Sequence, residues 1–330
     1  MAQGIALAVL GAAGLNGENL LGLLAESGLA YKSLLLVDED AFLGRKLEVG
    51  DKLLPLSSYA QVDFQEIDLV IACEPIPAEL VSQIGEQGAS LIAPQACLAD
   101  ALTEPVIAGV NLERQDLYKG MALGVPNAQA TVLARLLAPL QDELGLIGVQ
   151  ASWTRAVSLD GRGAIETLAG ETAQLLNGKK PKPSFYAEPL AFNLLGLDAA
   201  AEEAEFRQLW FQLWGDDRLH LSINTVLAPL FFGDIVSLSV ETEQPTGVAE
   251  LAELLCSAGG CETLEGAEKL LSAAQTKETA SIYLAQLRQM DTEGRRFTGL
   301  LALDSGRAGL ARNFLEIADN LVKKLFISYS

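Results

Sequence analysis

The stretch Ile5–Leu24 constrains the fold of this chain more than any other. An apolar run, Ile5–Leu10, is followed by Gly11, Gly14 and Gly17 and then by leucines at helical spacing. A short buried strand, a glycine-rich turn and a helix start form the βα unit that binds dinucleotides. Glycines let the backbone approach a pyrophosphate, and free N–H groups at the helix start favour its negative charge. The stretch therefore predicts a dinucleotide-binding domain.

The spacing of these glycines, G-x-x-G-x-x-G, is one residue wider than the commoner G-x-G-x-x-G. The same glycines also suit a tight strand-to-helix turn that binds no ligand. Asp38 follows the next apolar run, Ser33–Val37, ~20 residues beyond Gly17. An acid there accepts hydrogen bonds from the adenosine ribose and repels a 2′-phosphate, which favours NAD over NADP. An acidic loop after a strand is the alternative interpretation.

Composition narrows the class of protein. At 330 residues the chain is long enough for two domains, and half of its residues are apolar. A formal charge of −20 argues against nucleic acid and anionic membranes as partners, because both would repel it. No apolar run reaches the ~18 residues that a spanning helix needs, and no basic segment or cleavage site precedes the first strand. We therefore expect a cytoplasmic protein.

Residues that bind metals are scarce. The chain has one histidine, His220, and its four cysteines show no C-x-x-C spacing, so we expect no metal site. We expect a lone histidine of this kind to be structural. The cysteines are Cys73, Cys97, Cys256 and Cys261. In a reducing cytoplasm the last two are expected to be free thiols.

Apolar runs after the first helix predict further strands of the same sheet. They lie at Asp68–Ala72, Ser90–Ala93, Pro105–Val110 and Met121–Val125, with a helix at Pro77–Gln87 between the first two. Strands that alternate with helices in this way indicate a parallel sheet covered on both faces.

The pattern changes after a helix predicted at Ala130–Leu140. Long alternating runs at Gly148–Ser158 and His220–Thr242 indicate strands of an antiparallel sheet. Further elements predicted in this half are helices at Ala164–Leu176, Ala199–Leu213, Val248–Ser257 and Ala267–Ala274, and strands at Ser281–Gln289 and Thr298–Leu303. A final amphipathic helix, Leu310–Phe326, is expected to pack on the N-terminal domain.

Several motifs, in order along the chain, resemble those of the aspartate-semialdehyde dehydrogenase family. Gly11–Gly17 is similar to its G-A-T-G-x-V-G loop, Pro126–Ala128 lies where the family has P-N-C, and Ala156–Ser158 matches the A-V-S of its Y-Q-A-V-S-G-A-G segment. Further matches are Phe192-Asn193 with its F-N, Pro229–Asp234 with its P-V-F-x-G-H, and Asp304–Asn313 with its D-N-L-R-K-G-A-A-L-N.

The resemblance completes the predicted architecture. We expect an α/β chain with an N-terminal Rossmann-type parallel-sheet domain, residues 1–128 plus 310–330, and an α+β antiparallel-sheet domain, residues 129–309. The resemblance implies that the second domain is like the C-terminal domain of glyceraldehyde-3-phosphate dehydrogenase. It also implies a homodimer formed through the sheet of that domain.

The chemistry of this family needs a thiolate that attacks an acyl carbon and a histidine that moves protons. The resemblance places the nucleophile at Ala128, the histidine at Asp234 and the glutamine that orients the intermediate at Arg155. Positions implied for substrate binding are also changed, at Leu227, Ala99, Glu205 and Leu209. An alanine has no nucleophilic atom, so we expect this chemistry to be lost or altered. The Usg-like branch of the family, which lacks the catalytic cysteine, fits this pattern.

Other residues leave alternatives open. Cys97 could be a non-standard nucleophile, although no base adjoins it and a buried cysteine is usually inert. Asp234 could act as a carboxylate base, or could be a polar group in a remnant pocket. Arg155, Arg162 and Asp160 could line a remodelled pocket with Asp234, or could form surface ion pairs worth little.

The leading hypothesis is a homologue of the dehydrogenase that binds NAD or NADP, with NAD favoured by Asp38, and that has no intact catalytic residue. The residues predicted to bind the cofactor are Gly11, Ala13, Gly14, Leu15, Asn16, Gly17, Asp38, Ala72 and Asn313. Two alternatives stay open. One is an active NAD(P)-dependent oxidoreductase that acts on another aldehyde or oxo group, and the other is a partner-binding scaffold that binds no dinucleotide.

Overall fold

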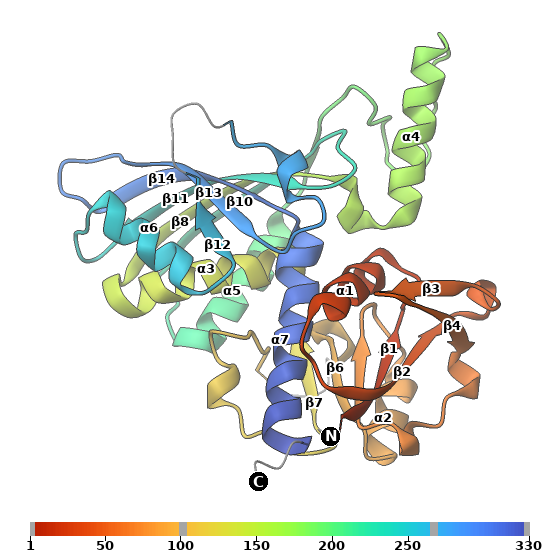
Figure 1. Cartoon of the computed structure of the whole chain (residues 1–330). Coiled ribbons are helices and arrows are strands. Elements are labelled where there is room, and N and C mark those ends of the chain that lie inside the picture. Colours follow the sequence, from red (N-terminus) through yellow and green to blue (C-terminus); the bar gives the residue numbers. More distant parts are fainter. Residues whose placement is uncertain (1–3, 99–103, 265–269, 327–330) are drawn as a thin grey trace. The chain divides into compact units, whose positions relative to one another are not determined.

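The structure, a computed structural model, describes residues 4–98, 104–264 and 270–326. The chain divides into two compact units (Figure 1): unit 1 is Met1–Thr131 with Gly309–Ser330, and unit 2 is Val132–Ala308. Each unit contains its own sheet, one mostly parallel and one mostly antiparallel. This confirms the predicted fold class.

The sheet of unit 1 has the strand order β3-β4-β2-β1-β5-β6-β7. Its strands are β1 (Ile5–Leu10), β2 (Tyr31–Asp38), β3 (Lys46–Val49), β4 (Lys52–Ser58), β5 (Leu69–Ala72), β6 (Ser90–Pro94) and β7 (Ala122–Val125). Its helices are α1 (Leu15–Glu26), α2 (Ala78–Glu86) and α7 (Arg312–Leu321). All the strand pairs described in this sheet are parallel except β3 with β4.

Strand β1 explains why this sheet needs cover on both faces. Leu7 and Val9 belong to one apolar core, which also contains Phe314 of α7 and Leu20 of α1. Ala8 and Leu10 belong to a second core with residues of α2. A strand buried on both faces is apolar throughout, which is the pattern that the sequence shows. The C-terminal helix therefore packs on the N-terminal domain, as predicted.

Unit 2 has a sheet of order β12-β13-β14-β11-β8-β10-β9. Its strands are β8 (Leu146–Arg155), β9 (Leu195–Leu197), β10 (His220–Leu227), β11 (Asp234–Thr242), β12 (Cys261–Thr263), β13 (Ile282–Gln289) and β14 (Arg296–Leu303). Its helices are α4 (Arg162–Leu176), α5 (Ala200–Trp214) and α6 (Val248–Ser257), and α3 (Ala128–Leu144) leads into the unit. The pairs β10–β8 and β12–β13 are parallel, and the other pairs described are antiparallel.

The sheet of unit 2 has a covered side and an open side. Helices α3, α5 and α6 lie on one side of its strands (Figure 1). Along β10 the residues Leu221 and Ile223 are buried, Ser222 between them is partly exposed, and His220 and Asn224 on either side are exposed. This period of two is what a half-covered sheet requires.

One predicted strand, Pro105–Val110, is wrong. These residues are extended and then turn, and the Val106 N–H donates to the Gly124 carbonyl at 2.7 Å. The buried side-chain amides of Asn111 and Asn313 bond backbone groups of this segment at 2.8 to 3.1 Å. The amides take the place of a partner strand, because buried backbone groups need a partner of some kind.

The predicted strand His220–Thr242 is two strands, β10 and β11. Pro229 has no N–H for a ladder, and Gly233 has a φ of +82°, so the chain turns between them. Of the helix predicted at Ala267–Ala274, the first three residues lie outside the described residues, and the remainder is helical only in a 3₁₀ turn, Ala273–Thr276. The sequence patterns also miss strand β4 and the short strands β3, β9 and β12.

Candidate functional site

The glycine loop (Gly11–Gly17) of unit 1 joins β1 to α1 in a tight turn. Gly11 has a φ of +70°, and the Gly14 N–H donates to the Gly11 carbonyl at 3.2 Å. A Cβ on Gly17 would lie 2.6 Å from the carbonyl oxygen of Ala12, so this position accepts only glycine. Helix α1 begins after Gly14 without a side-chain cap, so its first-turn N–H groups have no partner within the helix. This geometry suits an anion.

Asp38, at the end of β2, holds the glycine loop in place. Its side chain is buried, its Oδ2 accepts from the Ala13 N–H at 2.6 Å, and its Oδ1 accepts from the Glu39 N–H at 2.8 Å. Tyr59 lies in the same region, where burial and then the charge of Asp38 raise the pKa of Tyr59 to about 12. Each oxygen of Asp38 keeps a second lone pair, so a ribose contact stays a prediction.

Glu74, which the sequence patterns miss, lies over the glycine loop. It follows β5, the parallel neighbour of β1. Its Cγ is 3.0 Å from the position that a Cβ on Gly11 would take, and its Oε1 is 3.2 Å from that of a Cβ on Gly14. Asn16 donates through Nδ2 to Oε1 of Glu74 at 3.1 Å. Asn16, a predicted cofactor residue, is therefore bonded to this carboxylate.

Two other predicted cofactor residues are buried inside unit 1. Ala72 is the last residue of β5 and is fully buried. Asn313 accepts through Oδ1 from the Ala108 N–H at 2.8 Å and donates through Nδ2 to the Val106 carbonyl at 3.1 Å. The amide of Asn313 thus supports the backbone, and its contact with a cofactor stays a prediction.

Ala128, which the resemblance implies as the position of the nucleophile, is the first residue of α3 and is almost completely buried. Asn127 caps this helix start, since its Oδ1 accepts from the Ala130 N–H at 2.8 Å. A Cβ on Gly309 would lie 2.9 Å from the carbonyl carbon of Ala128, so the backbone is closely packed here. That Ala128 stands at the position of the family thiol stays a prediction.

Three of the implied site positions meet at one end of the sheet of unit 2. Leu227 of β10 pairs with Arg155 of β8 in the parallel ladder. Thr154, next to Arg155, pairs with Ile235, next to Asp234. The strand registers therefore bring Arg155, Leu227 and Asp234 together, and their roles stay a prediction.

Asp234 is buried, and both of its oxygens accept hydrogen bonds. Oδ1 accepts from the Ala156 N–H at 2.8 Å, and Oδ2 accepts from the Ser305 hydroxyl. Burial outweighs these hydrogen bonds and raises the pKa of Asp234 to about 6. The carboxylate joins the end of β8 to the segment after β14, which is a structural role.

Arg155 is joined to Asp160 and not to Asp234. Its Nη2 donates to the two carboxylate oxygens of Asp160 at 2.9 and 2.7 Å, and the Tyr186 hydroxyl donates to Oδ2 of Asp160 at 2.7 Å. The pocket that Arg155, Arg162, Asp160 and Asp234 could line is thus split between two hydrogen-bonded groups. One contains Arg155 and Asp160, and the other contains Asp234.

The cysteines differ in their surroundings. Cys97 is half-buried, and its Sγ accepts from the Ile76 N–H at 3.4 Å. Cys73 is buried, which raises the pKa of its thiol. Cys256 and Cys261 are free thiols whose Sγ atoms lie 2.9 Å apart, and their hydrogen bond lowers the pKa of Cys256 to about 7. Cys256 is therefore the thiol with a raised thiolate fraction.

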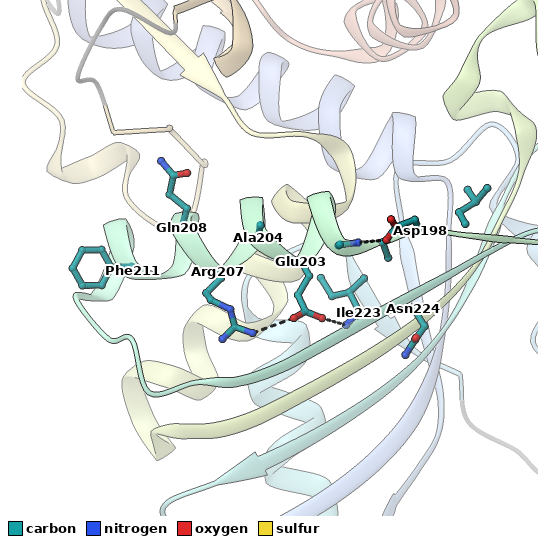
Figure 2. A pocket seen from close by; sticks show the side chains of 11 residues that line it. Asp198, Glu203, Ala204, Arg207, Gln208, Phe211, Ile223 and Asn224 are labelled. Carbon is teal, nitrogen blue, oxygen red and sulfur yellow. Dashed lines mark hydrogen bonds and ion pairs between the residues drawn. The ribbon is translucent and has the colours of Figure 1, made fainter.

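Helix α5 and strand β10 border a hollow of about 770 Å³ (Figure 2). Figure 2 shows Glu203 bonded on two sides, to Arg207 at 3.2 Å and to the Ile223 N–H at 3.0 Å. These charged groups fasten α5 to β10. Leu209, an implied substrate position on α5, is buried, and Glu205, another, is exposed and does not line this hollow.

The remaining predicted site features concern residue 99, metals and membranes. Ala99, implied as a phosphate-binding position, lies outside the described residues. Among residues 4–98, 104–264 and 270–326 no cluster of three or more metal-ligating side chains occurs. In the same ranges no helix combines the length and apolar character needed to cross a membrane.

Known proteins share this pair of sheets. Residues 137–304 match the family model for the dimerisation domain of semialdehyde dehydrogenases. A USG-1 protein homolog of Azotobacter vinelandii is 28% identical over 336 residues, which cover 98% of this chain and 99% of that protein.

Solved structures extend the similarity to the whole chain. The structure of a probable aspartate-semialdehyde dehydrogenase from Pseudomonas aeruginosa is 26% identical, with a TM-score of 0.87 over 98% of this chain and 99% of that one. An aspartate-semialdehyde dehydrogenase from Candida albicans, solved with NADP, has the same fold with a TM-score of 0.70 and 14% identity, over 97% and 100% of the two chains. With half of its length matched by the family model, this chain belongs to the semialdehyde dehydrogenase family.

Proposed function

We propose that this chain is an aspartate-semialdehyde dehydrogenase homologue that has lost the cysteine-dependent reaction and keeps a dinucleotide site on its glycine loop. The observation that carries the first part is the state of Asp234, whose two oxygens accept from Ala156 and Ser305. A general base must reach the proton that it removes, at hydrogen-bond distance. Asp234 is in addition only 2% exposed, so its carboxylate is withdrawn from a substrate, and Ala128 offers no atom that could form a thioester.

The proposed cofactor is NAD, bound at the start of α1. The start of α1, which no side chain caps, suits a pyrophosphate, and Gly11 and Gly14 add no side chains of their own between it and the backbone. Asp38 favours NAD over NADP because its charge would repel a 2′-phosphate. Bound NAD would supply hydride-transfer chemistry. The thioester on which the family uses that chemistry cannot form here, because residue 128 has no thiol. One group beside the loop, the carboxylate of Glu74, does not fit a pyrophosphate.

Calorimetric titration with NAD and NADP tests the cofactor proposal. We expect binding of NAD that is weak but measurable, and weaker binding of NADP. An Asp38→Asn variant removes the charge while it keeps an acceptor for Ala13, so it should narrow the difference between the two cofactors. If neither dinucleotide binds at millimolar concentration, the proposal of a cofactor site is wrong and a partner-binding scaffold becomes the better account.

We also propose a cytoplasmic homodimer formed through unit 2. The matched family model describes a dimerisation domain, and the sheet of unit 2 has an open side that exposes Asn224 and Ser237. Phe211 of α5 is also 54% exposed, although it is a large apolar side chain. Sedimentation velocity should give a dimer for the wild type and a monomer for Ser237→Arg, with Glu79→Arg in unit 1 as the control. A monomeric wild type would contradict this proposal.

A further inference from the structure

Glu74 stands where a bound pyrophosphate would lie. Glycines in a nucleotide-binding turn are there so that phosphate oxygens can approach the backbone. In this structure the space over Gly11 and Gly14 holds the side chain of Glu74, at 3.0 and 3.2 Å from the positions of their absent Cβ atoms. The space that the glycines leave free is thus filled by a carboxylate of the same chain.

The backbone and one hydrogen bond fix Glu74 in this place. The Cys73 N–H donates to the Leu10 carbonyl at 3.0 Å, which continues the pairing of β5 with β1 up to the residue before Glu74. Asn16, in the first turn of α1, donates to Oε1 of Glu74 at 3.1 Å and to the Cys73 carbonyl at 3.4 Å. Asn16 therefore holds the carboxylate at the start of α1.

The electrostatics at the glycine loop favour the presence of one negatively charged group and disfavour the binding of a second. The start of a helix attracts negative charge, and Glu74 already supplies it. Burial raises the pKa of Glu74, the hydrogen bond from Asn16 opposes that effect, and the negative charge of Asp38 adds to it. A pyrophosphate would bring further negative charge next to two carboxylates, those of Glu74 and Asp38.

We propose that Glu74 is an internal competitor of the dinucleotide pyrophosphate. A nucleotide binds at the glycine loop only after the Glu74 side chain leaves Gly11 and Gly14, and the affinity of the wild type is low for that reason. This inference rests on the proposed dinucleotide site and assigns the residue that controls its occupancy. It concerns two effects of Glu74, the space that it fills and the charge that it carries.

Two variants separate these effects. Glu74→Gln keeps the volume and an acceptor for Asn16 but removes the charge, whereas Glu74→Ala removes both the charge and the volume. Glu79→Gln, an exposed acid in the first turn of α2, is the matched control because it makes the same change of charge nearby. Thermal unfolding and circular dichroism of each variant without ligand establish that the fold is unchanged.

Binding of NAD and of inorganic pyrophosphate is then measured for each protein by calorimetry. We expect Glu74→Ala to bind both ligands at least ~10-fold more tightly than the wild type, a difference of about 1.4 kcal/mol. Glu74→Gln should lie between the two, and Glu79→Gln should match the wild type within about twofold, since an exposed charge is well screened.

The outcomes distinguish this inference from the proposed function. Equal NAD affinity in the wild type and both Glu74 variants overturns the inference and leaves the dinucleotide site standing. Tighter pyrophosphate binding by Glu74→Ala, with no NAD binding by any protein, supports the exclusion of anions from the loop by Glu74 and overturns the dinucleotide proposal. If the folded Glu74→Ala protein binds neither ligand, both proposals are wrong.

Discussion

Replacing Asp234 by asparagine is expected to stabilise unit 2 at neutral pH. Burial raises the pKa of this carboxyl from 3.8 to about 6. The folded state thus holds a proton that the unfolded chain releases, so stability from this group is present at low pH and falls as pH rises from about 4 to about 6. Over the whole titration the wild type loses about 3 kcal/mol of stability from this group, of which about 1.4 kcal/mol is lost between pH ~5 and pH ~7.5.

Asparagine avoids the buried charge and can keep both contacts. Its Oδ1 can accept from the Ala156 N–H, and its Nδ2 can donate to Oγ of Ser305. Asp234→Asn should therefore gain roughly 1–3 kcal/mol in free energy of unfolding at pH ~7.5, and this gain should shrink by about 1.4 kcal/mol at pH ~5. Asp234→Ala leaves two buried donors without acceptors, so it should cost about 2–5 kcal/mol at either pH.

Urea unfolding followed by tryptophan fluorescence measures these differences in free energy of unfolding within unit 2, which contains Asp234. The three tryptophans of the chain, Trp153, Trp210 and Trp214, all lie in unit 2. Burial also raises the pKa of Asp304, which gives the wild type a slope of the same sign. Comparing the free energy of unfolding of each variant with that of the wild type at each pH isolates the contribution of Asp234. A loss of more than about 1 kcal/mol for Asp234→Asn at pH ~7.5, or a difference that does not depend on pH, would refute this reasoning.

Three further predictions concern the glycine loop, the nucleophile position and the thiols. Gly17→Ala should destabilise unit 1 by about 2–3 kcal/mol in thermal unfolding, because the added Cβ would meet backbone atoms. Gly28→Ala should be nearly neutral, because its Cβ would meet no atom of a non-neighbouring residue within 4 Å. Equal effects of the two substitutions would contradict the packing described for the loop. Ala128→Cys alone should give no turnover of aspartate semialdehyde, because the histidine position is also changed; a measurable rate would show that one substitution restores the site. Cys256 should react with a thiol reagent before Cys73 does. A hydrogen bond lowers the pKa of Cys256, whereas burial raises the pKa of Cys73. Mass spectrometry of the labelled peptides gives the order of reaction.

Much of the fold could be predicted because the patterns that encode it are local. The apolar run of β1, the glycines after it and the leucines of α1 lie within one short stretch, and each agrees with the others. The strand predicted at Pro105–Val110 failed for a non-local reason. Its backbone groups bond to Asn313, which is 205 residues further along the chain than Ala108, and no local pattern carries that information.

The site shows the same division between local and non-local information. The changes proposed at Ala128 and Asp234 rest on the order of motifs along the sequence and stay predictions. That Asp234 is held by Ser305 could not, since the two residues are 71 positions apart. A signal for Glu74 was available in the sequence, because an acid directly after a buried strand lies at the carboxyl edge of a parallel sheet, where ligands bind. Its contact with the glycine loop, however, depends on the pairing of β5 with β1.

The central claim, that this member of the family has lost the cysteine-dependent reaction, is tested most directly by assaying that reaction. The protein is mixed with aspartate semialdehyde, phosphate and either NAD or NADP, and formation of the reduced cofactor is followed by absorbance. We predict no formation above the rate measured without protein. Turnover that requires the protein and disappears in Cys97→Ser would contradict the claim and identify Cys97 as the nucleophile.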